Sequence, residues 1–258
     1  MEENTQNNIE NNSTEKTISM PNSPKKLSMP VAIIIAGAII AFGIIASSRT
    51  GEFKLNNKGK INVKDPGESR MIEPVTKNDH IQGDLSKAKV AVIEFSDLQC
   101  PYCKQIHPAL QEMTKLYNTD VVWVYRHFPL ESIHPRARPS AHASECVNEL
   151  AGNEGFWKFV DAIFAHTGKD DPLSDESLIN FAINSGVDKD TVNKDAFIAC
   201  QNSGKYNDKI DDYLTDAENA GAEGTPDVTV VNLKTGEAIH VGANPQMLAK
   251  VLDKMLNK

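Results

Sequence analysis

The chain has 258 residues, enough for one large domain or two small ones, and 40% of them are hydrophobic while 24% are charged. Its formal net charge of −8 leaves no excess of Lys and Arg to neutralise phosphates, which argues against a nucleic-acid partner. Four cysteines are too few for a miniprotein built on disulfides, but they are enough for one active pair and one structural pair.

The N-terminal part of the chain reads as a tail followed by a membrane segment. Residues 1–28 are rich in Asn, Ser, Thr and Glu and predict a disordered tail. Residues 29–46 contain no charge, and as a helix these 18 residues rise about 27 Å, enough for the hydrocarbon core of a bilayer. We therefore expect a transmembrane anchor over 29–48. The small residues of "IIASS" leave a cleaved signal peptide open as the alternative.

The basic residues around this segment conflict with the cysteine chemistry described below. Applied literally, the positive-inside rule keeps the C-terminal part in the cytoplasm, because more basic residues follow the apolar run than precede it. Those upstream are Lys16, Lys25 and Lys26, and those downstream are Arg49, Lys54, Lys58, Lys60 and Lys64. Residues 49–79 carry Gly, Asn and Lys without a sustained apolar period and predict a flexible linker.

A single folded domain is expected over residues 80–258. β-Branched runs predict strands, and apolar residues at helical spacing predict helices. The predicted strands are 89–97, 120–128, 226–232 and 237–243; the predicted helices are 101–117, several within 136–220, and a last one capped by Asn244. This order predicts an α/β fold with a mixed sheet, flanking helices and an inserted helical subdomain.

The stretch "CPYC" places two cysteines at the start of the helix predicted over 101–117. The unsatisfied N–H groups and the dipole of a helix N-terminus stabilise an anion, so Cys100 is the expected attacking thiolate. Cys103 lies one turn further on and can resolve a mixed disulfide. Two alternatives remain: a metal site completed by residues such as His107, or two buried structural cysteines.

The residues around this motif resemble the DsbA-like branch of the thioredoxin fold. The resemblance rests on "EFSDLQCPYC" at the start of a helix, on the long helical insertion and on "GTPDVTVVN", and it covers roughly residues 80–257. It implies a thioredoxin-like sheet and thiol–disulfide exchange by Cys100 and Cys103, with no metal and no cofactor.

The resemblance also implies roles for residues outside the pair. Pro101 and Tyr102 would tune the stability of the thiolate, and Glu94 would be a buried acid that relays the proton of the resolving thiol. Thr225 and Pro226 match the family's cis-proline element, which presents a backbone to an extended substrate peptide. Cys146 and Cys200 match a second, structural disulfide within the insertion, with two free buried cysteines as the alternative.

Two departures limit what the resemblance transfers. The dipeptide between the cysteines is Pro-Tyr, so oxidising strength cannot be carried over, and Asp227 adds a negative charge after the proline. His127, His134 and His142 invite a metal site, but their spacing favours surface or helix-start positions.

The expected function is that of a membrane-anchored oxidoreductase that introduces disulfides into extracytoplasmic proteins. Its partners would be substrate proteins with cysteine thiols, a redox partner that reoxidises it, and the membrane through the N-terminal helix. Two rivals stay open: a reductase or isomerase of the same fold, and a metal-binding or metal-delivery module.

Overall fold

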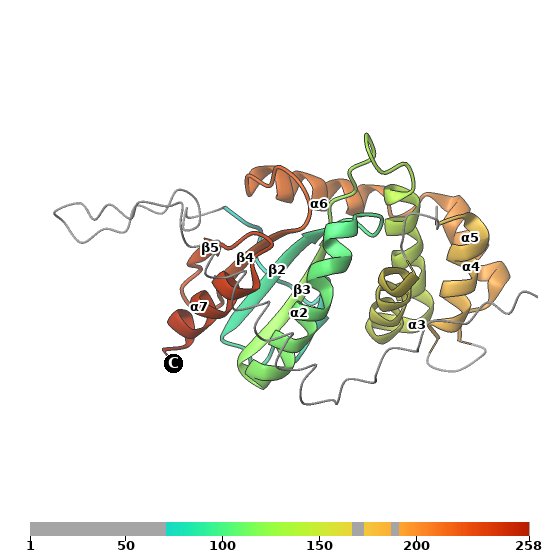
Figure 1. Ribbon diagram of the computed structural model, residues 1–258. Coiled ribbons are helices and arrows are strands. Elements are labelled where there is room, and N and C mark those ends of the chain that lie inside the picture. The colour runs from blue at the N-terminus through green and yellow to red at the C-terminus, as the bar shows by residue number, and fades with distance from the viewer. Residues whose placement is uncertain (1–70, 167–172, 187–190, 258) are drawn as a thin grey trace, which may run out of the picture. The chain divides into compact units, whose positions relative to one another are not determined.

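A mixed sheet of five strands forms the centre of the domain (Figure 1). The computed structural model describes residues 71–166, 173–186 and 191–257. The strand order is β1-β3-β2-β4-β5, in which β2 and β3 are parallel and the other neighbours are antiparallel. The strands are β1 (His80–Gln82), β2 (Val90–Ser96), β3 (Val121–His127), β4 (Asp227–Asn232) and β5 (Ala238–His240).

Helices follow the order that the sequence predicted. They are α2 (Pro101–Tyr117), α3 (Ala137–His166), α4 (Asp175–Asn184), α5 (Lys194–Ser203), α6 (Asn207–Asn219) and α7 (Pro245–Leu256), with a short 3₁₀ turn at Asn118–Asp120. The side chain of Asn244 accepts a hydrogen bond from the Met247 amide and so caps α7. α3 is interrupted at Gly152, whose φ of +69° is outside the helical range.

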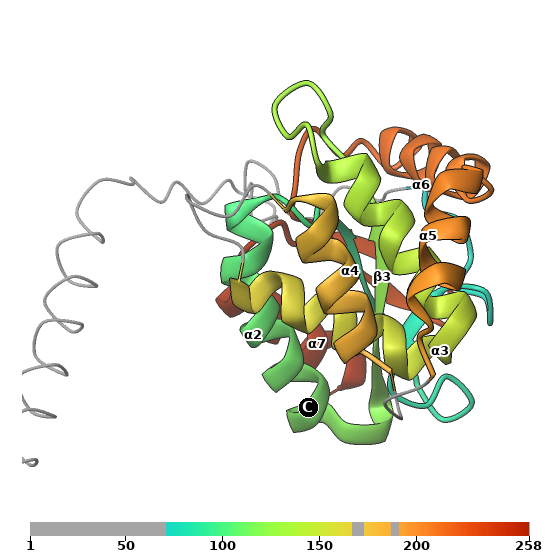
Figure 2. The same cartoon turned by 90° about the vertical axis from the view of Figure 1, so that its right-hand side faces the viewer.

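The alternation of side chains along the strands divides the core between the two faces of the sheet. Val92, Trp123 and Val230 belong to the first core, which α2, α3 and α7 cover. Figure 1 shows α2 and α7 in front of the sheet and α3, α4 and α5 together to its right, the side that faces the viewer in Figure 2. Ile93 and Val124 belong to the second core, to which α6 contributes Ala217. The first core contains both cysteines of the CPYC motif.

A buried ion-pair cluster fastens the chain that precedes β1 to the second face. Arg126 of β3 donates from Nε to Asp79 at 2.8 Å and from Nη1 to Asp216 of α6 at 2.6 Å. It also donates to the backbone carbonyl of Glu73, whose own amide donates to Asp216. The side chains of Arg126, Asp79 and Asp216 are at most 5% exposed.

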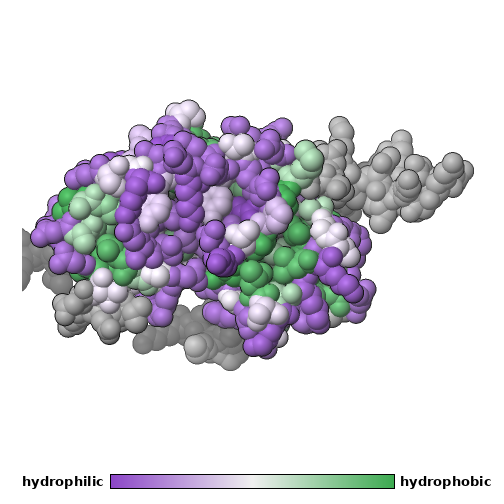
Figure 3. Space-filling model, turned by 180° about the vertical axis from the view of Figure 1, so that it is seen from behind, coloured by the Kyte–Doolittle hydropathy of each residue, from purple (hydrophilic) through white to green (hydrophobic). Residues whose placement is uncertain are grey.

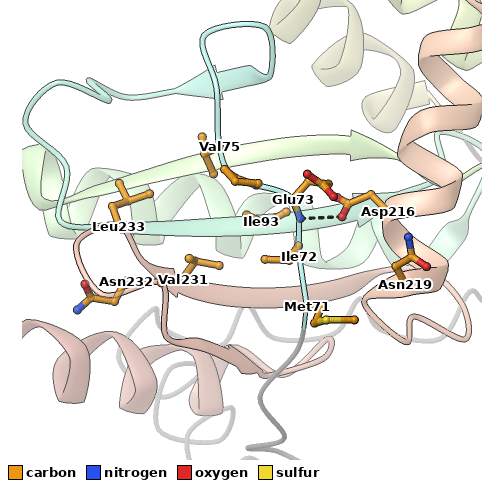
Figure 4. Close-up of a pocket in the computed structure, with 12 residues that line it drawn as sticks. Met71, Ile72, Glu73, Val75, Ile93, Asp216, Asn219, Val231, Asn232 and Leu233 are labelled. Atoms are coloured by element: carbon orange, nitrogen blue, oxygen red, sulfur yellow. Dashed lines mark hydrogen bonds between the residues drawn. The ribbon is translucent and has the colours of Figure 1, made fainter.

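A cavity of about 620 Å³ opens on this second face, between the segment before β1 and strands β2 and β4. Its apolar lining includes Ile72, Val75, Ile93, Val231 and Leu233 (Figure 4). Figure 3, which views the molecule from behind, shows hydrophobic residues gathered on this side. The cavity is therefore separated by the sheet from the two cysteines of the first core.

The predicted tail (1–28), the anchor (29–48) and the linker up to residue 70 lie outside the described residues. Among the helices that the structure describes, none is long and apolar enough to cross a bilayer. The strand predicted at 237–243 ends at His240, because the chain turns at Gly242 with a φ of +57°.

Candidate active site

The two cysteines of the motif lie where β2 gives way to α2. Cys100 is the residue before the helix, with extended backbone angles (φ −74°, ψ 123°), and Pro101 opens the first turn. Cys103 follows one turn later and is fully buried, whereas Cys100 is 3% exposed. Both thiols are free. Both sulfurs are therefore buried at the helix start, and Cys100 alone keeps a small exposed fraction.

The segment before β4 meets this pair from the far end of the sequence. The Cys100 thiol donates to the backbone carbonyl of Thr225 at 3.4 Å, and the Thr225–Pro226 peptide bond is cis. β4 reaches this position because it pairs with β2, with Asp227 opposite Phe95. The fold thus brings the predicted substrate-binding residues against the predicted nucleophile.

The two thiols differ sharply in acidity. A hydrogen bond from Cys103 is the main cause that lowers the pKa of Cys100 to about 5; burial opposes it, and Thr225 and backbone amides of the first helical turn add to the lowering. Burial raises the pKa of Cys103, and the hydrogen bond to Cys100 and the charge of Glu94 raise it further. At neutral pH the pair therefore consists of a Cys100 thiolate and a Cys103 thiol.

Glu94 lies in the interior of β2 with no exposed surface. Its carboxylate accepts hydrogen bonds from Ser96 Oγ at 2.8 Å and from Trp123 Nε1 at 3.0 Å. Burial raises the pKa of Glu94 to about 7, against the opposing charge of His107 and these two hydrogen bonds. A carboxyl group with this pKa can both take and give a proton at neutral pH.

Asp97 organises the loop between β2 and α2, and sequence reasoning did not single it out. Its carboxylate accepts from the amides of Gln99 (2.7 Å) and Leu130 (2.9 Å) and lies 2.8 Å from Nδ1 of His134. Its own amide donates to the Cys103 sulfur at 3.5 Å. Asp97 therefore links the active-site loop to the segment after β3, and its carboxylate holds the His134 ring in position.

Two residues flank the pair in contrasting ways. The Tyr102 side chain is 64% exposed beside Cys100 and is free to contact a bound molecule. Asp227, which follows Pro226, is buried, and its carboxylate lies 3.0 Å from Nε2 of His240. The carboxylate of Asp227 is therefore buried beside His240 and does not add an exposed charge next to Pro226.

Cys146 of α3 and Cys200 of α5 form a disulfide with an S–S distance of 2.01 Å and a Cα–Cα distance of 5.8 Å. This bond joins two helices of the insertion that are 54 residues apart in sequence. Both cysteines are buried in the first core, so the bond is a structural one.

A second polar cluster, which the sequence did not predict, lies between β1, β3 and α3. Glu145 Oε1 lies 2.7 Å from His80 Nε2 and 3.2 Å from His127 Nε2. Among the described residues these three form the one group with the spacing of metal ligands. The Lys209 ammonium, 2.8 Å from the other Glu145 oxygen, already supplies a cation there.

We expect this cluster to make the domain sensitive to acid. Burial lowers the pKa of His80 to about 4, so between pH 6.5 and 4 the unfolded chain binds a proton at His80 that the folded chain does not. Stability therefore falls as the pH drops through this window, by about 2 kcal/mol between pH 6.5 and 5. Urea unfolding should show this loss in the natural protein and a smaller one in His80→Gln. His166→Gln, at an exposed histidine, is the control and should keep the full loss; an unchanged pH dependence in His80→Gln would contradict the prediction.

The sheet, the helix-start cysteine pair and the cis-proline segment give the chain a thioredoxin-like fold with the site arrangement of DsbA-like proteins. The thioredoxin family model matches residues 75–253, and the chain belongs to this family. The structure is similar to that of DsbA2 from Pseudomonas aeruginosa, with 25% identity and a TM-score of 0.57 over 71% of this chain and 97% of that one.

Two further comparisons extend the picture. Oxidised BdbD from Bacillus subtilis shares the fold with a TM-score of 0.62 at 18% identity, over 74% of this chain and 99% of that chain. A Na(+)/H(+) antiporter, NhaA 1 of Mycolicibacterium gilvum, is 31% identical over 161 residues, which are 62% of this chain and 24% of the antiporter. The chain thus spans about a quarter of the length of the curated relatives that it matches.

Proposed function

We propose that this protein is an oxidase that introduces disulfides into extracytoplasmic proteins through Cys100 and Cys103. The proposal rests on one observation: the reduced pair is stabilised as a Cys100 thiolate, with a pKa of about 5, next to a buried Cys103 thiol. A pair whose reduced form is stabilised gives up its disulfide readily to other thiols.

The reaction proceeds by two thiol–disulfide exchanges. A substrate thiolate attacks Sγ of Cys100 in the oxidised enzyme, the Cys100–Cys103 bond breaks, and the Cys103 sulfur leaves and takes up a proton. The second substrate thiolate then attacks the substrate sulfur of the mixed disulfide and releases the Cys100 thiolate. The substrate has lost two electrons and gained a disulfide, and a redox partner must reoxidise the enzyme.

Other residues of the site fit this cycle. The backbone of Thr225 lies against Cys100 and would pair with an extended substrate peptide, to which the exposed ring of Tyr102 would offer an apolar contact. Glu94 supplies a proton to the leaving Cys103 sulfur and removes it again when Cys103 attacks.

We also propose that the domain works outside the cytoplasm, tethered by the apolar segment 29–48. The Cys146–Cys200 disulfide supports an oxidising compartment, since such bonds persist there and are rare in the reducing cytosol. The uncharged run of residues 29–46 supports the tether.

The deciding experiment is a redox equilibrium of the full chain, in mild detergent, against glutathione buffers. Trapping the thiols by alkylation and weighing the peptides follows Cys100 and Cys103 separately from the structural disulfide. A midpoint nearer −120 mV than −270 mV is the expected result for an oxidase. A midpoint near −270 mV would assign the domain to the reductases. Stoichiometric zinc that protects Cys100 from alkylation would favour the metal-binding alternative.

A further inference from the structure

His107 lies one helical turn beyond Cys103 on α2, and its side chain contacts the partly exposed carboxylate of Asp161. The side chain is buried, and its Nε2 lies 2.6 Å from Oδ1 of Asp161 on α3. At this distance one proton must lie between the two atoms. Gln111 donates to the same Asp161 oxygen at 2.8 Å. The pair is therefore held in place from both helices.

The inner nitrogen of the same ring has no partner among the described residues. His107 Nδ1 is buried without a hydrogen bond, although buried polar atoms are nearly always paired. The ring can thus take a proton at Nδ1 while it passes the Nε2 proton to Asp161, which is how an imidazole moves protons.

Trp123 connects this ring to the acid beneath the cysteines. The Trp123 indole donates to Glu94 at 3.0 Å, and its ring packs edge-on against His107 with centroids 5.0 Å apart. Glu94 and His107 therefore contact the same side chain of β3. Once His107 is protonated, its charge lowers the Glu94 pKa against the effect of burial.

Asp161 is the end that meets solvent. Its side chain is 44% exposed and lines a hollow of about 490 Å³ together with Gln111, Thr114 and Lys115 of α2. These residues belong to the second half of the helix, and Gln111 is eight residues, about 12 Å of helix rise, beyond Cys103. The hollow thus opens away from the helix start, where a substrate would cover Cys100 and Thr225.

We propose that Glu94, His107 and Asp161 form a proton path between Cys103 and this hollow, which stays open while a substrate covers the cysteines. The inference rests on the proposed function, in which the Cys103 sulfur takes up a proton when it leaves and gives one up when it attacks. When Cys103 attacks Sγ of Cys100, its thiol proton moves to the Glu94 carboxylate. A proton then passes to Nδ1 of His107, whose ring packs against the same Trp123 that contacts Glu94, and the Nε2 proton leaves through Asp161 to solvent. When Cys103 is the leaving group, the protons run the opposite way.

The other titratable groups around Cys103 do not offer the same route. Burial keeps the pKa of Tyr125 well above its usual value, so this phenol of β3 stays neutral. Asp97 contacts the Cys103 sulfur through its backbone amide, while its carboxylate is held by Leu130 and His134. A variant of His134 is therefore the control for a proton path that would reach solvent through Asp97 and His134.

The test uses the full-length reduced protein and measures the attack by Cys100 separately from the attack by Cys103. A synthetic, unstructured peptide dimer joined by one disulfide is the probe. Attack by Cys100 releases the first peptide, and attack by Cys103 releases the second; acid quenching and mass spectrometry count both. The variants are Glu94→Gln, His107→Phe and Asp161→Asn. The controls are His134→Gln and Asp253→Asn, since Asp253 also accepts a hydrogen bond from an α2 residue, Tyr117.

We expect each of the three variants to slow the second release about tenfold or more at pH 7. In His107→Phe and Asp161→Asn, the first release and the thiolate absorbance of Cys100 should stay at the values of the natural protein, and both controls should resolve normally. Added imidazole should restore the second step in His107→Ala, a rescue that a purely structural histidine would not show.

Three outcomes would overturn the path. In the first, His107→Phe and Asp161→Asn release the second peptide at the natural rate while Glu94→Gln is slow. In the second, these two variants slow both releases equally. In the third, His134→Gln is the variant that slows the second release. If Cys103 fails to displace the second peptide even in the natural protein, the path is overturned, whereas the oxidase function, in which the substrate's own second thiol resolves the mixed disulfide, is decided separately by the glutathione equilibrium.

Discussion

Replacing Cys100 by serine is expected to abolish disulfide exchange, whereas replacing Cys103 by serine should leave the first attack intact and trap a mixed disulfide. The reason is the difference between the two sulfurs: Cys100 reacts as a thiolate at the helix start, while Cys103 is buried behind it and acts only on the bond that Cys100 has formed. Mass spectrometry of each variant after incubation with a reduced or oxidised peptide measures both effects.

The pH profile sharpens this prediction. Because the pKa of Cys100 lies at about 5, alkylation of the reduced protein by iodoacetamide should be nearly constant from pH 6 to 8 and should fall to half near pH 5. A Cys103→Ala variant should lose reactivity at a higher pH, because it removes the hydrogen bond from Cys103 that is the main stabiliser of the thiolate. A midpoint near the ordinary thiol value in the natural protein would contradict this account of the site.

Replacing Arg126 by leucine is expected to destabilise the domain by about 4 kcal/mol, because it leaves the carboxylates of Asp79 and Asp216 buried without their cation. The matched variant Arg138→Leu removes an arginine that also pairs with two acids, Glu131 and Asp211, but at the surface. Its expected cost is within about 1 kcal/mol. Urea unfolding of both variants at pH 7 makes the comparison.

A second substitution identifies the cause of this loss. Adding Asp79→Asn and Asp216→Asn to the Arg126→Leu variant removes the uncompensated charges, so part of the stability should return. If the Arg126 and Arg138 variants lose the same stability, the buried cluster does not fasten the N-terminal segment as its geometry implies.

The sequence by itself determined the order of strands β2 to β5 and of the helices, together with the place of the cysteine pair, but not β1. These features are local: a β-branched run, a Pro at the first helical position and a C-x-x-C spacing are complete within a few residues. The first thiolate could therefore be assigned to Cys100 from the position of the helix start alone.

The tertiary structure decided everything that depends on contacts between distant segments. Thr225 meets Cys100 across 125 residues only because β4 pairs with β2, and Glu94 acquires its raised pKa only once the sheet and its helices have removed it from water. Asp161 gave no sequence signal, since an acid on a helix is usually just solvated. The proposed role of Asp161 depends on its contact with His107 on another helix, and a single sequence does not show which helices pack together.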